Sequence, residues 1–215
     1  MIKIGVFDSG IGGVAFAKEL QNAHPSYDVT VVHDRKHLPF GDKTPEQIQQ
    51  FTEDAITPLL GRDVIVLACN TATAYAIDYL REAHPQQLFV GFEPAIKTAS
   101  KRSLTRKVAV LATPATLKSP RYHALKEPYF GVLEIFEPNV SSLAHQIETR
   151  TVNWRKLEAL MSNLVHNRVD QVVLACTHYH LIQNTLASFT NNQAEIITPT
   201  DAVIHRIVSL LATKP

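Results

Sequence analysis

The strongest constraint on the fold is an internal repeat that divides the chain into two halves. The segment Asp63-Val-Ile-Val-Leu-Ala-Cys69 returns 107 residues later as Asp170-Gln-Val-Val-Leu-Ala-Cys176, in a chain of 215 residues. Self-similarity at a fixed offset indicates two copies of one structural unit, and each half is long enough for a compact domain. We therefore predict a first domain from residues 1–95 with 203–215, and a second from residues 96–202.

Short apolar runs alternate with helical patterns through both halves. The runs are continuously apolar, which is typical of strands buried on both faces of a parallel sheet. The expected strands are Ile2–Phe7, Asp28–His33, Asp63–Ala68, Leu88–Gly91, Lys107–Ala112, Val132–Phe136, Asp170–Ala175 and Ala194–Ile197. The clearest helix is Asn153–Val165, whose apolar residues fall at three- and four-residue spacing, and we expect its Trp154 in the core.

The alternation of strand and helix predicts the α/β class. Because of the repeat, we expect two pseudo-symmetric doubly wound parallel-sheet domains with the active site between them. A single eight-stranded barrel is the alternative, but 215 residues would be short for that fold.

The charge balance and the apolar pattern exclude several classes of partner. The 21 Lys and Arg residues against 20 Asp and Glu leave a net charge of +1, so we expect neither nucleic acid nor a membrane surface as a partner. No run of about 18 apolar residues occurs, and Met1–Gly13 does not have the pattern of a secretory leader. With only two cysteines, the composition fits a cytoplasmic protein whose thiols are not bridged.

Polar side chains follow four of the expected strands directly. They are Asp8 and Ser9; Asn70 and Thr71 after Cys69; Thr113 and Thr116; and Thr177 and His178 after Cys176. In open α/β sheets, ligands bind outside the carboxyl ends of the strands. Neutral amide and hydroxyl groups there suit a ligand carboxylate. The glycines that follow Ser9 lack the Lys-Ser/Thr of a P-loop, so they do not predict a nucleotide site.

The two cysteines carry the sharpest chemical signal. A thiol at a helix N-terminus is expected to have a lowered pKa, and only the thiolate acts as a base or nucleophile. Two thiols on opposite sides of one ligand could remove a proton from one face and deliver a proton to the other, which inverts a stereocentre without a cofactor. Asp8 and His178 would orient or deprotonate them. Buried, inert core cysteines are the alternative interpretation.

A metal site is not expected. Cys176, His178 and His180 give three candidate ligands on one turn, which is an incomplete set, and no C-x2-C partner exists elsewhere in the chain.

Several segments together resemble the signature segments of the glutamate racemase family, within the aspartate/glutamate racemase superfamily. They are Asp8–Gly13, Pro39–Gly41, Ala68–Ala72, Glu93–Ala95 and Cys176–Tyr179. The similarity runs from residue 4 to about residue 208. The resemblance implies a cofactor-independent racemase of two α/β domains that interconverts L- and D-glutamate. It also implies a role in supplying D-glutamate for peptidoglycan synthesis, and a homodimer.

The resemblance also implies roles for individual residues. Cys69 and Cys176 would be the paired acid/base thiols, with Asp8 assisting Cys69 and His178 assisting Cys176. The implied substrate contacts are Asp8, Ser9, Phe40, Gly41, Asn70, Thr71, Thr113, Thr116, Thr177 and His178, with Asp34 and Glu148 as weaker candidates.

Three alternatives stay open on the sequence. Phe40 stands where the family usually has Tyr, so the substrate could be aspartate or another acidic amino acid instead of glutamate. A regulatory protein with a racemase-like fold would bind a ligand without catalysis. A dithiol oxidoreductase is disfavoured, because its two cysteines would lie 107 residues apart and be held on opposite sides of a cleft.

Overall fold

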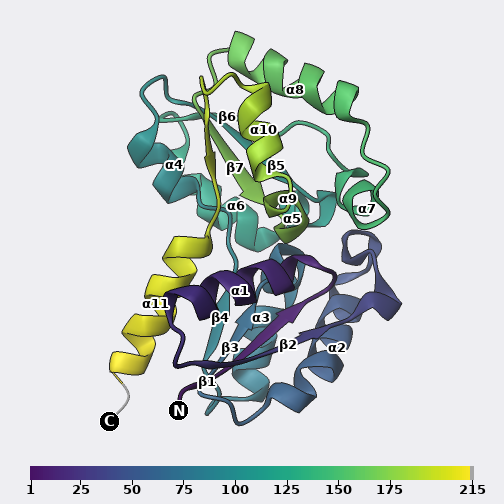
Figure 1. Cartoon of the computed structure of the whole chain (residues 1–215), viewed down its shortest axis with the longest axis vertical. Coiled ribbons are helices and arrows are strands. Elements are labelled where there is room, and N and C mark those ends of the chain that lie inside the picture. Colours follow the sequence, from purple (N-terminus) through teal and green to yellow (C-terminus); the bar gives the residue numbers. More distant parts are fainter. Residues whose placement is uncertain (214–215) are drawn as a thin grey trace. The chain divides into compact units, whose positions relative to one another are not determined.

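The computed structural model describes residues 1–213, and the chain divides into two compact units (Figure 1). Unit 1 is Met1–Glu93 together with the C-terminal segment that begins at Pro199, and unit 2 is Pro94–Thr198. Each unit is built on a four-stranded sheet in which the strands are parallel. The predicted α/β class with two parallel sheets is therefore confirmed.

Unit 1 has the sheet order β2-β1-β3-β4. Its elements are β1 (Lys3–Asp8), α1 (Gly12–Ala23), β2 (Asp28–His33), α2 (Pro45–Ile56), β3 (Val64–Leu67), α3 (Asn70–Ala83), β4 (Phe89–Gly91) and α11 (Thr200–Ala212), with short 3-10 helices at Arg35–His37, Phe40–Asp42 and Thr57–Leu59. Helix α2 begins in a capping box, in which the Thr44 hydroxyl accepts from the Gln47 N–H and the Gln47 side chain accepts from the Thr44 N–H.

Helices cover both faces of the unit 1 sheet. Ile4 and Val6 of β1 pack with apolar residues of α1 and α11, whereas Phe7 packs with α2 and α3 on the opposite face. Successive strand residues point to opposite faces, so a strand buried on both sides must be apolar at every position. This burial is the physical reason why the runs in the sequence do not alternate with polar residues.

Unit 2 has the sheet order β6-β5-β7-β8, which is the same spatial order of second, first, third and fourth strand as in unit 1. Its elements are α4 (Ile96–Arg102), β5 (Lys107–Ala112), α5 (Pro114–Lys118), α6 (Pro120–Lys126), a 3-10 helix (Glu127–Tyr129), β6 (Glu134–Phe136), α7 (Leu143–Glu148), α8 (Trp154–His166), β7 (Gln171–Ala175), α9 (Thr177–His180), α10 (Gln183–Phe189) and β8 (Glu195–Ile197). The sequence repeat thus corresponds to a repeat of sheet topology.

The unit 2 sheet is also covered on both faces. Val108 and Val110 of β5 pack with residues of α4 and α6, while Ala109 and Leu111 pack with residues of α7, α8 and α10. The repeated aspartates stabilise equivalent corners of the two units. Asp63 accepts from the Lys3 N–H at 2.8 Å, and Asp170 accepts from the Leu104 and Thr105 N–H groups at 2.7 and 2.8 Å.

All eight expected strands form, and the helix expected over Asn153–Val165 is α8 with Asn153 as its N-cap. The expectation that Trp154 is a core residue is wrong, because its side chain is 44% exposed. Trp154 is the first residue of α8, and the buried stripe of the helix begins only at Leu157. Spacing alone does not reveal that the first turn extends past the core.

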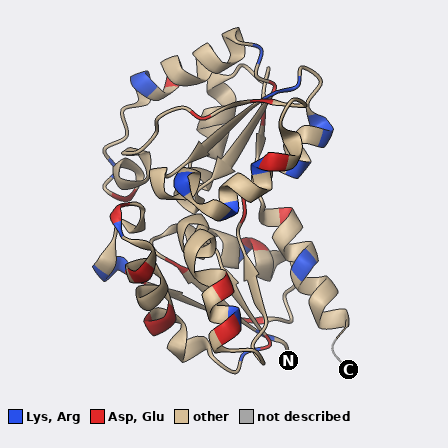
Figure 2. Ribbon diagram, turned by 180° about the vertical axis from the view of Figure 1, so that it is seen from behind, with Lys and Arg blue, Asp and Glu red and all other residues tan. Residues whose placement is uncertain are grey.

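Charge is distributed unequally between the two units. Unit 1 has nine Lys and Arg residues against 13 Asp and Glu, and unit 2 has 12 against seven. Figure 2 shows both signs on the ribbons of both units, with the unit 2 cations spread over several elements that include α4, α6 and α8. Among residues 1–213, none of the helices combines the length and the apolar character that a membrane span needs.

Candidate active site

The first cysteine lies where β3 passes into α3 in unit 1. Cys69 is the N-cap of α3, and the Ala72 N–H donates to its Sγ at 3.5 Å. The Ser9 hydroxyl lies 3.2 Å from the same sulfur. Asp8 is the last residue of β1, which is hydrogen-bonded to β3; Ser9 follows it, and both residues are buried. Adjacent strand ends thus bring Asp8, Ser9 and Cys69 together.

The expected lowering of the Cys69 pKa by the helix N-terminus is wrong. Burial of the thiol, followed by the negative charge of Asp8, raises the pKa of Cys69 from its ordinary 9.0 to about 11. The hydrogen bonds from Ser9 and from the Ala72 N–H act in the opposite direction but are weaker. Cys69 therefore rests as a neutral thiol that is suited to donating a proton.

This raised pKa predicts a loss of stability at alkaline pH. Below pH 9 the thiol is protonated in both the folded and the unfolded chain, whereas between pH 9 and about 11 it ionises only in the unfolded chain. The free energy of unfolding should therefore fall over this range, by up to about 2–3 kcal/mol for one group.

Urea unfolding from pH 8 to 11 checks this expectation. Relative to Cys69→Ala, the wild-type curve should fall by this extra amount, while tyrosine ionisation is common to both proteins and cancels. Parallel curves would show that the Cys69 thiol ionises normally in the folded chain.

Asn70 and Thr71 form the first turn of α3 and are buried. The Asn70 Nδ2 group donates to the Phe92 carbonyl at 3.2 Å, whereas its buried Oδ1 atom has no hydrogen-bond partner within residues 1–213. Sequence reasoning did not identify Thr73, which ties this turn to the sheet. Its hydroxyl donates to the Leu67 carbonyl at 3.0 Å and accepts from the Phe92 N–H at 3.1 Å. Threonine in a helix gives no signal of such a role.

Phe40 and Gly41 lie in the 3-10 helix that precedes α2. The Phe40 ring is buried beside Phe7 and Phe51, at centroid distances of 6.2 and 6.5 Å. Its side chain is therefore part of the unit 1 core. Asp34 is a weaker candidate for substrate binding, and its Oδ2 atom is hydrogen-bonded to the Nδ1 atom of His37 at 2.7 Å.

The second cysteine occupies the equivalent position in unit 2, after β7 and before α9. Its Sγ lies 3.9 Å from the Nδ1 atom of His178. The Nε2 atom of His178 in turn lies 2.8 Å from Oε2 of Glu148, at the end of α7. Cys176 and His178 are buried. His178 therefore contacts Cys176 through one ring nitrogen and Glu148 through the other.

This arrangement orients the imidazole toward the thiol. An ionised carboxylate can only accept a hydrogen bond, so Nε2 carries a proton when Glu148 is ionised. In the neutral ring, Nδ1 then has a free lone pair that faces the thiol at the 3.9 Å contact. The group can accept a proton from Cys176 or hold the thiolate as an imidazolium. The contacts of the Cys69 sulfur within residues 1–213 are with the Ser9 hydroxyl and the Ala72 N–H, and neither partner is a histidine.

The remaining candidate site residues of unit 2 are three threonines. Thr113 is the N-cap of α5, and its hydroxyl accepts from the Thr116 N–H at 3.2 Å and lies 3.0 Å from the Thr116 hydroxyl. Thr177 begins α9 beside Cys176. All three are buried at the carboxyl ends of the adjacent strands β5 and β7.

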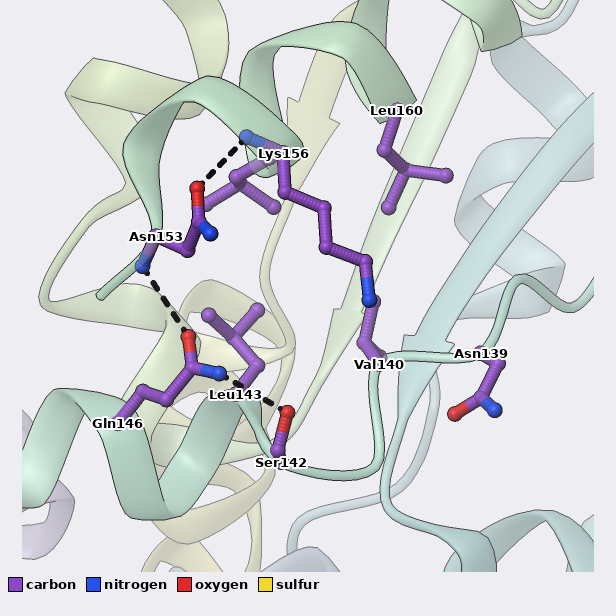
Figure 3. A pocket seen from close by; sticks show the side chains of 9 residues that line it. Asn139, Val140, Ser142, Leu143, Gln146, Asn153, Lys156 and Leu160 are labelled. Atoms are coloured by element: carbon purple, nitrogen blue, oxygen red, sulfur yellow. Dashed lines mark hydrogen bonds between the residues drawn. The ribbon is translucent and has the colours of Figure 1, made fainter. Parts of the chain in front are cut away.

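A separate pocket of about 190 Å³ opens between α7 and α8. Figure 3 shows the Lys156 side chain extending across it toward Val140, with Ser142, Gln146 and Asn153 joined by hydrogen bonds along one side. None of the candidate site residues lines this pocket. The candidate catalytic and substrate-binding residues therefore lie at the strand ends and not in this cavity.

Comparison with known proteins shows the family of the chain. Residues 14–207 match the model of the Asp/Glu/Hydantoin racemase family. A glutamate racemase of Sulfurovum sp. is 35% identical, over 99% of this chain and 84% of that protein. The E. coli glutamate racemase in complex with L-glutamate and the activator UDP-MurNAc-ala has a TM-score of 0.83 at 25% identity, covering 99% of this chain and 83% of that one.

A third protein, the Francisella tularensis glutamate racemase in complex with D-glutamate, has a TM-score of 0.80 at 27% identity, covering 98% of this chain and 81% of that one. The matches extend through both units and include both cysteine segments. The chain therefore belongs to the Asp/Glu/Hydantoin racemase family and is an isomerase of the amino-acid racemase class.

Proposed function

We propose that this protein is a glutamate racemase that interconverts L- and D-glutamate by two-thiol acid/base catalysis. The observation that carries the proposal is the equivalent placement of Cys69 and Cys176 at the carboxyl ends of corresponding strands, each beside its own polar partner. The 35% identity to a curated glutamate racemase supports glutamate as the substrate.

In the proposed reaction, one thiolate removes the α-proton and becomes a thiol, which leaves a planar carbanion-like species. The other thiol donates its proton to the opposite face of the α-carbon and becomes a thiolate. One Cα–H bond breaks and one forms, so the product differs from the substrate only in configuration. The two thiols have then exchanged protonation states, and proton exchange with solvent resets them.

The surroundings of the two thiols favour different resting states. The pKa of Cys69 is raised to about 11, which favours the proton-donating thiol form. Cys176 faces the imidazole of His178, which Glu148 orients, so the ring is placed to accept the thiol proton. One direction of the reaction starts once Cys176 has passed its proton to the ring, whereas the other first requires a proton to leave Cys69.

Substrate recognition is proposed for the neutral polar groups at the strand ends. The unpartnered Asn70 Oδ1 atom can accept a hydrogen bond from the substrate ammonium group. Ser9, Thr71, Thr113, Thr116 and Thr177 are buried hydroxyl donors for the two carboxylates. Fixed donors stabilise the charge that develops on the α-carboxylate during proton removal.

Solvent-deuterium exchange at the α-carbon tests this function. The protein in D2O should incorporate deuterium into both L- and D-glutamate and racemise them, with kcat/KM at least about tenfold above that for L-aspartate. The extra methylene of glutamate and the position of its second carboxylate supply this discrimination.

Equal or faster exchange with aspartate would overturn glutamate as the substrate. Binding of glutamate without any exchange would instead indicate a non-catalytic protein on the same fold. Either result would leave the family assignment intact.

The resemblance to glutamate racemases also supports a physiological proposal. D-Glutamate made by this protein would supply peptidoglycan synthesis in the cytoplasm. The reaction as written uses only protein side chains, and no cofactor is part of the proposal.

A further inference from the structure

The segment between β2 and α2 is held by a histidine that the reaction itself does not use. The Nδ1 atom of His37 lies 2.7 Å from Oδ2 of Asp34. The His37 ring also stacks on the Phe51 ring of α2, with centroids 3.8 Å apart and planes 5° from parallel. One imidazole thus joins the start of this segment to the helix that follows it.

The two residues that His37 contacts, Asp34 and Phe51, are themselves held in unit 1. The Asp34 N–H donates to the carbonyl of Asp8 at 3.2 Å, so Asp34 is tied to the backbone of a candidate catalytic residue. Phe51 lies beside Phe40, and Phe40 lies beside Phe7 of β1. The Asp34 side chain is 9% exposed and that of His37 is 29% exposed, so the pair is screened from water on one side.

We propose that His37 is a positioning residue that holds residues 38–42 in place, so that Phe40 and Gly41 present their backbone to the substrate. This inference rests on the proposed function and on the substrate contacts of Phe40 and Gly41 that the resemblance to glutamate racemases implies. Because the Phe40 ring is buried in the core, its contribution to the substrate comes from the backbone, and the contacts of His37 with Asp34 and Phe51 hold the chain just before it. Asp34 then acts through His37 and does not contact the substrate.

Holding a binding segment in its bound conformation lowers the ordering cost of binding and affects KM more than kcat. His37→Ala removes both the hydrogen bond and the stack, so we expect KM for glutamate to rise about tenfold while kcat changes by less than about twofold. His37→Arg keeps a planar donor that can bind Asp34 and stack on Phe51, and it should restore most of the lost KM.

The matched control is His24→Ala. His24 also stacks on an aromatic ring in unit 1, that of Tyr27, at 4.7 Å and 9°, but at the end of α1 away from this segment. It should leave KM unchanged. This comparison separates the loss of a stacked imidazole in general from the loss of this one.

Amide hydrogen exchange supplies a second measurement that does not depend on activity. Peptides covering residues 34–44 should exchange faster in His37→Ala than in the wild type or in His24→Ala, with His37→Arg close to the wild type. If glutamate is not the substrate, the wild type will show no glutamate kinetics to compare, but the hydrogen-exchange pattern still tests whether His37 holds residues 38–42 in place. Unchanged exchange, or a fall in kcat at constant KM, would overturn the proposal.

Discussion

Replacing either Cys69 or Cys176 by alanine is expected to abolish racemisation of both glutamate enantiomers, by at least about a thousandfold. In the proposed mechanism each thiol carries a proton to or from one face of the α-carbon, and general acid/base groups contribute about 10²- to 10⁴-fold to such steps. Inversion needs both faces, so a single missing thiol blocks both directions. This outcome has the largest expected effect on activity.

Deuterium exchange adds information that racemisation alone does not provide. The remaining thiol of each alanine variant can still remove and return a proton on its own face, so residual exchange should be confined to one enantiomer. That enantiomer should be opposite in Cys69→Ala and Cys176→Ala. Serine at either position should slow α-proton exchange unequally for the two enantiomers, because a hydroxyl is a much weaker acid than a thiol and each of the two positions faces a different enantiomer.

The matched comparison is the double variant, which should show no exchange with either enantiomer. Val14→Ala, at a position that is 55% exposed on α1, should exchange both enantiomers as the wild type does. Near-wild-type racemisation by either single alanine variant would rule out the two-thiol mechanism.

Gly13→Ala is expected to cost both stability and activity, although alanine normally favours a helix by about 1 kcal/mol over glycine. Gly13 is the second residue of α1, and a Cβ atom there would lie 2.6 Å from the Cβ atom of Asp8. Neither atom is at the end of a flexible side chain, so the backbone around Asp8 must shift. Overpacking of this kind costs about 1–3 kcal/mol.

The consequence for activity follows from the identity of the displaced residue. Asp8 lies at the end of β1 beside Ser9 and raises the pKa of Cys69, so its displacement changes the surroundings of that thiol. We expect a fall of at least about tenfold in kcat/KM, together with a lower urea midpoint. Val14→Ala on the next residue of the same helix is the control, and it should change neither. A stable and fully active Gly13→Ala would contradict the close approach of α1 to Asp8.

Much of the fold was predictable because its determinants are local in the sequence. Runs such as Val64–Leu67 and Gln171–Ala175 are apolar at nearly every position, and only a strand covered on both faces requires this. The repeat around Cys69 and Cys176 predicted two equivalent sheets. The helix N-cap position of Cys69 followed from the polar residues after it.

Properties that depend on distant residues were predicted less well. The direction of the Cys69 pKa was wrong, because burial and the charge of Asp8, 61 positions away in the chain, outweigh the helix N-terminus. Glu148 was a weak candidate, yet its carboxylate lies 2.8 Å from His178, since α7 packs beside α9. Asp34 was a weaker candidate for substrate binding, and its hydrogen bond to His37 did not follow from the sequence.

By itself the sequence determined the class of fold, the positions of its strands along the chain and the choice of two candidate catalytic thiols, because apolar periodicity and a repeated motif are local features of the sequence. Only the tertiary structure decided which partner each thiol has and in which protonation state Cys69 rests. Those properties depend on burial and on the distances between charges, and both arise only when separate strand ends meet at one edge of a sheet.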